Sequence, residues 1–330
     1  ITLGDVLKFV YGRYTFTAIA RDILFVLGTF SEVYSITIVG KFLDEVANIL
    51  LNWNAFSLDQ FWNSSAFTYI AMIFVLWSIQ QVCNQARLHL YTVVYEKVWE
   101  DARYMMVAKV SKSNLQDIEQ GKFQDLLTYV PAYSIDRIIL TYDSFSGVVG
   151  NLVRILSAAT IIFETMSWSV LFIILFVVPQ IVVVHIRRKK IREYQDESVG
   201  KLKYLNYLLN VTLQISNFLE LRVNDTFAYL KRRYVEEYDE FLGGYLKTDA
   251  NMYRDRTIVN ILGQCLKFAY VIYMLSVAII RKYSLGTFKA LYDYVDMTYT
   301  SVYNIFDSMS YISALLGYDE KFFELMNYEG

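Results

Sequence analysis

Two apolar runs, each about as long as a membrane span, lie next to each other in the middle of the chain. The first covers residues 147–163 and the second covers 168–184, with only a short polar break between them. At about 17 residues, each run is just long enough to cross the hydrocarbon core of a bilayer as a helix. A basic run follows at 185–192. The pattern predicts a helical hairpin that turns on one side of a membrane and continues as a polar, helix-forming segment on the other.

Apolar helical segments also occupy most of the remaining chain, and few residues interrupt them. Neither Gly nor Pro occurs between positions 66 and 120, so nothing stops a helix that leaves the membrane there. At 1.5 Å per residue, a helix from 66 to about 110 is roughly 65 Å long, about twice the bilayer core. We therefore predict an all-α membrane protein whose transmembrane helices extend far into the cytosol. Its six spans are expected at about 16–50, 66–110, 124–164, 168–209, 220–281 and 287–318.

Smaller features divide these helices. The segment 1–15 is short and amphipathic, and we expect it to lie in the membrane interface before the first span. Pro131 is expected to kink the third helix because proline lacks an amide hydrogen and crowds the preceding turn. The residues from Arg281 to Ser284 form a minimal turn between the last two spans. The whole chain, 1–330, is expected to be a single transmembrane domain.

Composition supports the membrane class and charge gives its orientation. Of 330 residues, 55% are hydrophobic and only 19% are charged, which leaves too much apolar surface for a soluble domain to bury. Lys and Arg crowd 97–122 and 187–256 and are absent from 50–86. By the positive-inside rule the basic stretches face the cytosol. We expect a multi-pass integral protein of a bacterial cytoplasmic membrane, with both termini in the cytosol and the lipid bilayer as its environment.

Several kinds of chemistry lack their sequence signatures. The chain has no GxxxxGK[ST] phosphate loop, no HExxH zinc motif and no GxSxG nucleophile elbow. Its cysteines, Cys83 and Cys265, fall inside apolar segments and are expected to be small core residues. We therefore assign no catalytic, cofactor or metal residue to this chain. Basic residues lie only in the membrane-proximal stretches, so nucleic acid is not an expected partner.

The order and spacing of these segments resemble the transmembrane domain of an ATP-binding-cassette (ABC) exporter across essentially the whole chain. The most specific parts are Ser284 to Phe288, which precede the last span, and Lys321 to Asn327, which match a basic-x-Phe-Glu-Leu-x-acidic exit with Asn at the acidic position. The resemblance implies an ATPase domain after residue 330, fused or separate, which would bind ATP and magnesium. It also implies a homologous second transmembrane domain, in a homodimer or a heterodimer.

In that family, the tips of two inner excursions dock on the ATPase domains. The resemblance places these coupling tips at about 113–121 and 210–218. In the first tip the chain keeps Gly121 but has Asp125, Leu126 and Val130 where the family usually has Ser-Arg and Asp. The residues implied in coupling are Leu115, Gln116, Asp117, Ile118, Gln214, Ile215, Ser216, Asn217 and Phe218.

Ionisable side chains within the spans are the candidate substrate site, because charges in a bilayer usually face protein or water. One face of the last span carries, at helical spacing, Asp293, Asp296, Thr300, Tyr303, Asp307 and Ser310. Other spans supply Glu32, Arg154 and Lys267 at a similar depth. These groups either line a cavity and contact substrate, or hold helices together through pairing of Glu32 and Asp307 with Arg154 and Lys267, or occupy unrelated polar niches. Arg87, near the inner end of its span, is expected to snorkel to the interface.

The function that follows is the membrane-spanning half of an ATP-driven ABC transporter. Export of peptide, lipid or drug-like amphipathic substrates by alternating access fits the acidic stripe best. A membrane receptor or scaffold that holds a cytosolic partner without transport is an alternative. A membrane-embedded enzyme that uses the buried acids is the weakest reading, because no nucleophile, metal set or phosphate loop accompanies them.

Overall fold

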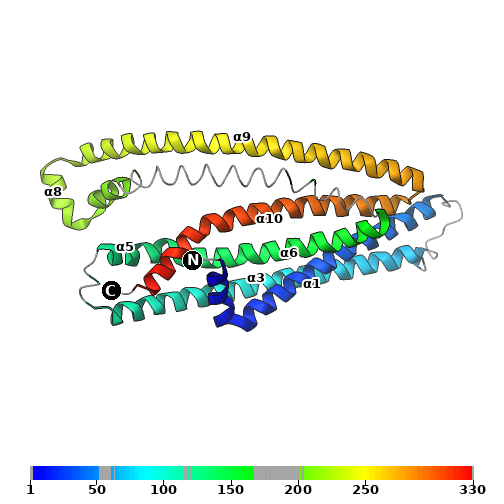
Figure 1. Cartoon of the computed structure of the whole chain (residues 1–330), viewed down its shortest axis with the longest axis horizontal. Coiled ribbons are helices and arrows are strands. Elements are labelled where there is room, and N and C mark those ends of the chain that lie inside the picture. The colour runs from blue at the N-terminus through cyan, green and yellow to red at the C-terminus, as the bar shows by residue number, and fades with distance from the viewer. Residues whose placement is uncertain are drawn as a thin grey trace. The chain divides into compact units, whose positions relative to one another are not determined.

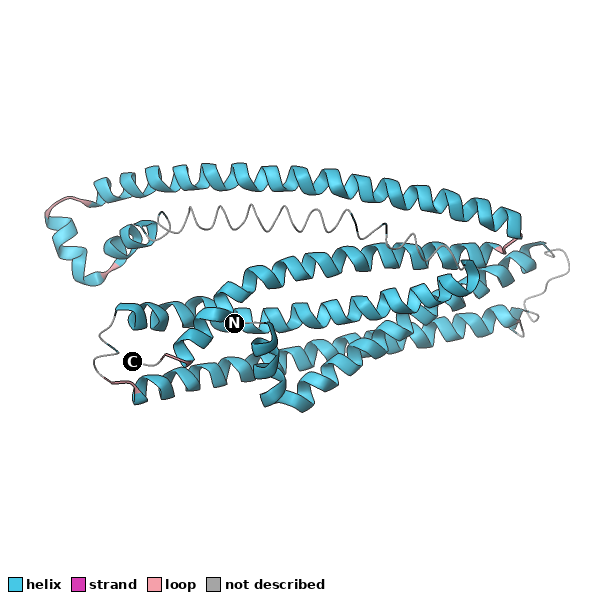
Figure 2. Cartoon of the chain, in the orientation of Figure 1, coloured by secondary structure: helices cyan, strands magenta, loops and turns pink. Residues whose placement is uncertain are grey.

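The computed structural model describes residues 3–51, 61–62, 64–114, 118, 121–166, 175, 178, 201 and 204–328. Nearly all of these residues are helical and none of them lies in a strand, which confirms the all-α class (Figure 2). Four described helices are long and apolar enough to cross a membrane: α1 (Leu3–Leu51), α3 (Ser65–Lys112), α6 (Ile135–Met166) and α9 (Phe227–Arg281).

The other two expected spans have different outcomes. Most of the span at 168–209 lies outside the described residues, as does the basic run at 185–192. The span at 287–318 forms part of α10 (Leu285–Met326), which is long enough to cross a bilayer but is not among the four apolar helices. The middle of α10 is rich in Tyr, Ser, Thr, Asn and Asp, which lowers its hydropathy. Six spans therefore remain a prediction, of which four have helices of suitable length and composition.

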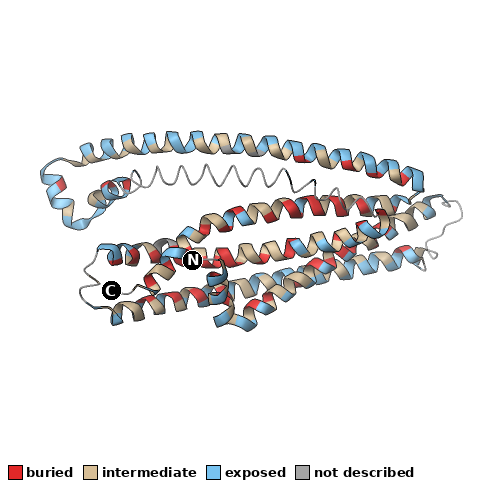
Figure 3. Ribbon diagram, viewed as in Figure 1, coloured by how far each residue is buried: buried red, intermediate tan, exposed pale blue. Residues whose placement is uncertain are grey.

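The chain divides into two compact units, residues 1–177 with 266–330 and residues 178–265. In the first unit, α1 packs along α3, α6 packs along α10, and α1 also contacts α6 and α10 (Figure 1). Two apolar clusters hold this unit together. One contains the fully buried Phe123, Tyr142 and Phe322, and the other contains Tyr294 and Met274. Buried residues recur along the whole length of α10, which is consistent with a helix inside a bundle (Figure 3).

The long helix α1 bends at Tyr14, whose φ of −118° and ψ of 35° are not helical (Figure 1). The hydroxyl of Tyr14 donates to the carbonyl oxygen of Lys97 at 3.1 Å and to the carboxylate of Asp101, both on α3. On the N-terminal side of the bend, Val6 and Val10 are fully buried in the first apolar cluster. The bend separates a short segment from the long helix close to the boundary expected at 15 and 16. The location of this segment in a membrane interface stays a prediction.

The kink expected at Pro131 takes the form of a π-helical segment, Val130–Ser134, between α5 (Gly121–Tyr129) and α6. Proline has no amide hydrogen to donate, and its ring displaces the preceding turn, so the α-helical ladder is interrupted there. The third expected helix is thus built from three consecutive pieces.

In the second unit, the described helical residues 204–213 are followed by a turn, a short helix α8 (Phe218–Val223) and the long α9. The expected helix at about 220–281 begins at Phe227, seven residues later than predicted. Asp225 has a φ of 48°, a left-handed conformation that ends α8 and reverses the chain. The pair Gly243 and Gly244 does not interrupt α9.

The turn after α9 brings α10 into very close contact with α1. Lys282 in this turn has a φ of 55°, and the Ser284 hydroxyl accepts a hydrogen bond from the Thr287 amide at 3.1 Å as the N-cap of α10. The Asp44 carboxylate on α1 accepts hydrogen bonds from the Gly286 amide and the Ser284 hydroxyl, both at 2.6 Å. A Cβ atom on Gly286 would lie 1.8 Å from the carbonyl oxygen of Gly40. Glycine at 286 is therefore required for this helix crossing.

We predict that Gly286→Ala lowers the thermal stability of the chain in detergent. The added methyl group would meet backbone atoms of α1, so the two helices must move apart, at a cost of about 1–3 kcal/mol or more. Gly317→Ala on the same helix is the control, because no atom lies within 4 Å of its Cβ position. Relief of the glycine penalty should leave that variant as stable as wild type or about 0.5–1 kcal/mol more stable. Equal melting temperatures for the two variants would contradict the assignment.

Candidate functional site

A polar pocket of about 420 Å³ lies in the first unit, among α1, α3, α6 and α10. Five of the eight residues expected to contact substrate line it: Glu32, Arg154, Asp293, Asp296 and Thr300. Residues from four helices that are far apart in the sequence thus converge on one space. The remaining lining residues are Ser35, Ile36, Trp77, Gln80, Met297, Ser301 and Asn304.

An ion pair between α1 and α6 forms one wall of this pocket. The Nη2 and Nε atoms of Arg154 lie 2.7 and 3.0 Å from Oε2 of Glu32. Nη1 of Arg154 also donates to the Asn151 side chain at 3.3 Å. The pairing of Glu32 with Arg154 was one of the alternatives predicted from the sequence. The two side chains remain 31% and 23% exposed, so the pair both joins the helices and faces the pocket.

A second ion pair has a different partner from the one predicted. Lys267, in the last third of α9, pairs with Asp296 of α10 and not with Asp307. The Lys267 ammonium, 14% exposed, also lies 5.7 Å from the ring centre of Tyr299. Within α10, Lys289 pairs with Asp293 one turn away. Spacing along single helices gave the approximate depth of these groups but not which helices pack together.

The acidic stripe of α10 does not line the pocket along its whole length. Asp293, Asp296 and Thr300 line the pocket, whereas Tyr303 and Asp307 do not. Ser310, at the end of the stripe, is buried. At 3.6 residues per turn, Asp307 stays within about 40° of Asp293, but at 1.5 Å per residue it lies roughly 21 Å farther along α10. The stripe therefore leaves the pocket because of its length along the helix axis.

Some lining residues were not predicted. Trp77 and Gln80 come from α3, and Asn304 comes from the next turn of α10. Gln80 and Gln81 are adjacent amides in an otherwise apolar run, and this polar interruption is the signal that could have identified them. A further missed feature is Arg21, which is fully buried, pairs with Asp143 and lies 4.7 Å from the ring centre of Tyr142.

The chemistry of the pocket suits binding better than reaction. Three carboxylates, those of Glu32, Asp293 and Asp296, face it beside one guanidinium, that of Arg154. In the described part of the chain, no group of three or more His, Cys, Asp or Glu side chains is placed to hold a metal ion. Carboxylates and an indole ring together provide charge complementarity and a cation–π surface for a positively charged or amphipathic molecule.

The two expected coupling tips differ in how much of them can be described. In the first tip, Leu115, Gln116 and Asp117 lie outside the described residues, and Ile118 packs against the apolar cluster of its own unit. In the second tip, Gln214 leaves helical geometry and a single 3-10 turn, Ile215–Asn217, leads into α8.

The second tip presents apolar side chains to solvent. The Asn217 amide donates to the carbonyl oxygen of Val211 at 3.2 Å and to the Gln214 side chain at 3.3 Å, which holds the turn closed. Ile215 is 92% exposed, and Phe218 and Leu219 are also exposed. Exposed large apolar side chains gathered in one short segment are typical of a contact surface.

A buried carboxyl group lies outside the pocket, just after the last expected span. Asp319 is fully buried between α10 and α6, and its Oδ2 accepts a hydrogen bond from Thr141 at 2.7 Å. Its Oδ1 has no hydrogen-bond partner among the described residues. Burial raises the pKa of Asp319 to about 7, against the opposing effects of the Thr141 hydrogen bond and the nearby charge of Arg137. This group therefore changes charge near neutral pH.

No protein-family model matches the chain, and no curated protein matches its sequence. The resemblance to exporter transmembrane domains accordingly rests on the order and spacing of segments in this chain. The polar pocket and the exposed second tip are therefore the features that indicate its function.

We predict that removing either partner of the Glu32–Arg154 pair destabilises the chain. Glu32→Gln and Arg154→Gln should each cost about 1–3 kcal/mol, between the values for exposed and fully buried pairs. The double variant should lose less than the sum, as measured by chemical unfolding in detergent. The exposed pair Arg232–Glu236, whose side chains are 71% and 57% exposed, is the control and should couple by about 0.5 kcal/mol or less. Full additivity in the first cycle would mean that the pair contributes no interaction.

The raised pKa of Asp319 predicts a decline in stability as pH increases. The folded chain keeps this proton up to about pH 7, whereas an unfolded chain releases it near 3.8. Between these values the folded state binds more protons, so the free energy of unfolding falls as pH rises. Asp319→Asn should remove this decline in unfolding experiments across the same pH range. The exposed neighbour provides the control Glu320→Gln, which should keep the wild-type profile.

Proposed function

We propose that this chain is the membrane-spanning half of a dimeric ATP-driven transporter of the ABC type, which exports cationic or amphipathic molecules. The observation that carries the proposal is the polar pocket between α10 and three helices, α1, α3 and α6, that are long and apolar enough to cross a membrane. Carboxylates at the depth of a bilayer are costly, by about 2.5–3.5 kcal/mol each on insertion scales, and usually mark a substrate or ion path. A pocket of about 420 Å³ falls within the range of small-molecule sites.

The charge of the pocket defines the class of cargo. Asp293 and Asp296 supply negative charge, and Trp77 supplies an aromatic face. Their present partners are the flexible side chains of Lys289 and Lys267. A positively charged group on a peptide, lipid or drug-like molecule would take the place of a lysine ammonium at the same carboxylate. The carboxylate stays paired in this exchange, and the displaced ammonium has to turn to water, which is easier for Lys289, 46% exposed, than for Lys267, 14% exposed.

The long helices provide the mechanical connection that transport requires. At 1.5 Å per residue, the 48 residues of α3 and the 55 of α9 extend roughly 70 and 80 Å, more than twice the bilayer core. Each of these helices is continuous from its apolar to its charged part. Motion at the cytosolic end is thereby carried to the level of the pocket, as alternating access by rigid-body movement demands.

The proposal assigns the exposed apolar residues of the second tip to contact with an ATPase domain. Ile215 lies in the 3-10 turn and Phe218 and Leu219 lie in α8, and together they offer an exposed apolar contact surface. ATP and magnesium would bind in that domain, which lies outside this chain. Six spans, a homologous second transmembrane domain, cytosolic termini and a bacterial cytoplasmic membrane complete the proposal.

A receptor or scaffold is the second candidate, and the exposed tip favours it equally. A tip that binds a cytosolic partner needs no pocket, whereas a transporter needs both. Substitutions in the pocket therefore distinguish a transporter from a scaffold.

The test is transport by the protein reconstituted with its ATPase in vesicles, using a panel of cationic amphipathic compounds. Asp293→Asn should raise the apparent KM for such a compound about tenfold, the effect of losing one charge-assisted hydrogen bond. Asp307→Asn, on the same helix but outside the pocket, should leave KM unchanged. Absence of any ATP-dependent transport in wild type would exclude the exporter and leave the scaffold. Equal effects of the two substitutions would show that the pocket is not the substrate site.

A further inference from the structure

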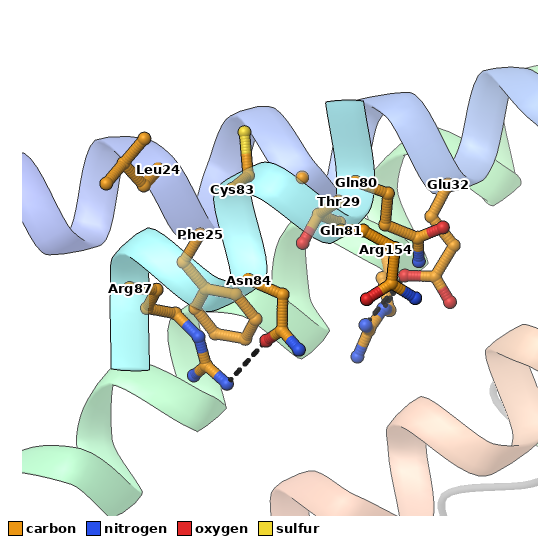
Figure 4. Close-up of a pocket in the computed structure, with 11 residues that line it drawn as sticks. Leu24, Phe25, Thr29, Glu32, Gln80, Gln81, Cys83, Asn84, Arg87 and Arg154 are labelled. Carbon is orange, nitrogen blue, oxygen red and sulfur yellow. Dashed lines mark hydrogen bonds and ion pairs between the residues drawn. The ribbon is translucent and has the colours of Figure 1, made fainter. Parts of the chain in front are cut away.

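A second, smaller pocket of about 90 Å³ lies among α1, α3 and α6 (Figure 4). The two pockets share Glu32, Gln80 and Arg154. The smaller pocket differs in charge, because Arg87 lines it and Asp293 and Asp296 do not. One water molecule needs only about 10–15 Å³ of such space, so the pocket has room for a phosphate-sized group.

Arg87 is held in a fixed orientation at this pocket. Its guanidinium lies 4.6 Å from the ring centre of Phe25 on α1, and Nη2 donates to the Asn84 side chain at 3.2 Å. Figure 4 shows the arginine, the phenylalanine ring and the amide side by side at one end of the pocket. An arginine that simply extended into solvent or headgroups would not need these two contacts. The side chain is positioned in advance for a ligand.

The positive charge of Arg87 has no carboxylate partner among the described residues. The acidic groups nearest to it are already used, since Asp143 pairs with Arg21 and Glu32 pairs with Arg154. Its Nε atom is buried without a hydrogen-bond acceptor. The hydroxyl of Thr29, which is 2% exposed and also lines the pocket, is unpaired as well. Two buried donors and one uncompensated charge point to an anion with several acceptor oxygens.

An apolar groove adjoins the pocket at Cys83. It measures about 300 Å³, and the described residues that line it all belong to α3, among them Phe74, Ile79 and Val82. From Phe74 to Val82 the helix rises about 12 Å, which fits within the roughly 15 Å hydrocarbon thickness of one leaflet. Cys83 lines both the groove and the pocket, whereas Arg87 lies one turn farther along α3 and on the face that points into the pocket. An acyl chain in the groove would therefore reach a polar head at Arg87 by passing around Cys83.

We propose that Arg87, Thr29 and Asn84 bind the phosphate of an anionic phospholipid of the inner leaflet, whose acyl chain lies along the α3 groove. Basic pockets between membrane helices on the cytosolic side are suited to anionic lipid heads. The guanidinium supplies a planar donor pair that matches phosphate oxygens. A bound lipid would also support the Glu32–Arg154 wall that the two pockets share. The inference does not depend on transport, since a scaffold with the same helices would bind the same lipid.

The test is native mass spectrometry of the purified chain in detergent, titrated with phosphatidylglycerol or with phosphatidylcholine of identical acyl chains. Wild type should bind phosphatidylglycerol about tenfold more tightly, which corresponds to about 1.4 kcal/mol. Arg87→Gln should abolish this preference, and Arg87→Lys, which keeps the charge but not the planar donor pair, should retain part of it.

Arg103→Gln is the matched control. Arg103 is another α3 arginine stacked on an aromatic ring, that of Trp99, but it lines neither pocket. This variant should bind both lipids as wild type does. Ile79→Asn in the groove should weaken phosphatidylglycerol binding without altering the fold, as judged by circular dichroism.

Three results would overturn the proposal. The first is an unchanged lipid preference in Arg87→Gln, and the second is an equal loss in Arg103→Gln. The third is complete displacement of phosphatidylglycerol by excess inorganic phosphate, which would make the site a simple anion site in which the groove has no part.

Discussion

Charged side chains among membrane-length helices need partners, and this requirement organises the first unit. Arg21 with Asp143, Glu32 with Arg154, and Lys267 with Asp296 each join two different helices. An unpaired charge at that depth is unfavourable, so each pair fixes the rotation and depth of its helices relative to one another. Packing between apolar side chains alone specifies such positions poorly in lipid, because the tails of the lipid are as apolar as the side chains they replace.

The same pairs divide the interior into regions of opposite charge. Glu32 and Arg154 line both pockets. In the larger pocket they accompany the aspartates of α10, which suit cations, and in the smaller one they accompany Arg87, which suits an anion. A shift of the shared ion pair would change both pockets together. Substrate binding and lipid binding would then be coupled through one pair of side chains, as linkage between two sites requires.

Close backbone contact between α1 and α10 positions these two helices where no ion pair of the described residues joins them. Gly40 and Gly286 allow α1 and α10 to approach to backbone contact, and the Asp44 carboxylate joins both by accepting from the first turn of α10. Small residues at helix crossings allow the short distances at which such packing is effective in a membrane. The Ser284 to Phe288 segment, distinctive in the sequence, thus has a structural explanation in a capped helix start and a required glycine.

The sequence by itself determined the helical class, four spans of suitable length, the break at Pro131 and five residues of the pocket. These features follow from local patterns: apolar length, backbone chemistry of proline and charges within apolar runs. Only the tertiary structure decided that Lys267 pairs with Asp296, that Gln80 and Trp77 face the acids, and that Arg87 is left without a carboxylate. Such properties depend on which faces of distant helices meet, and periodicity within one helix carries no information about its neighbour.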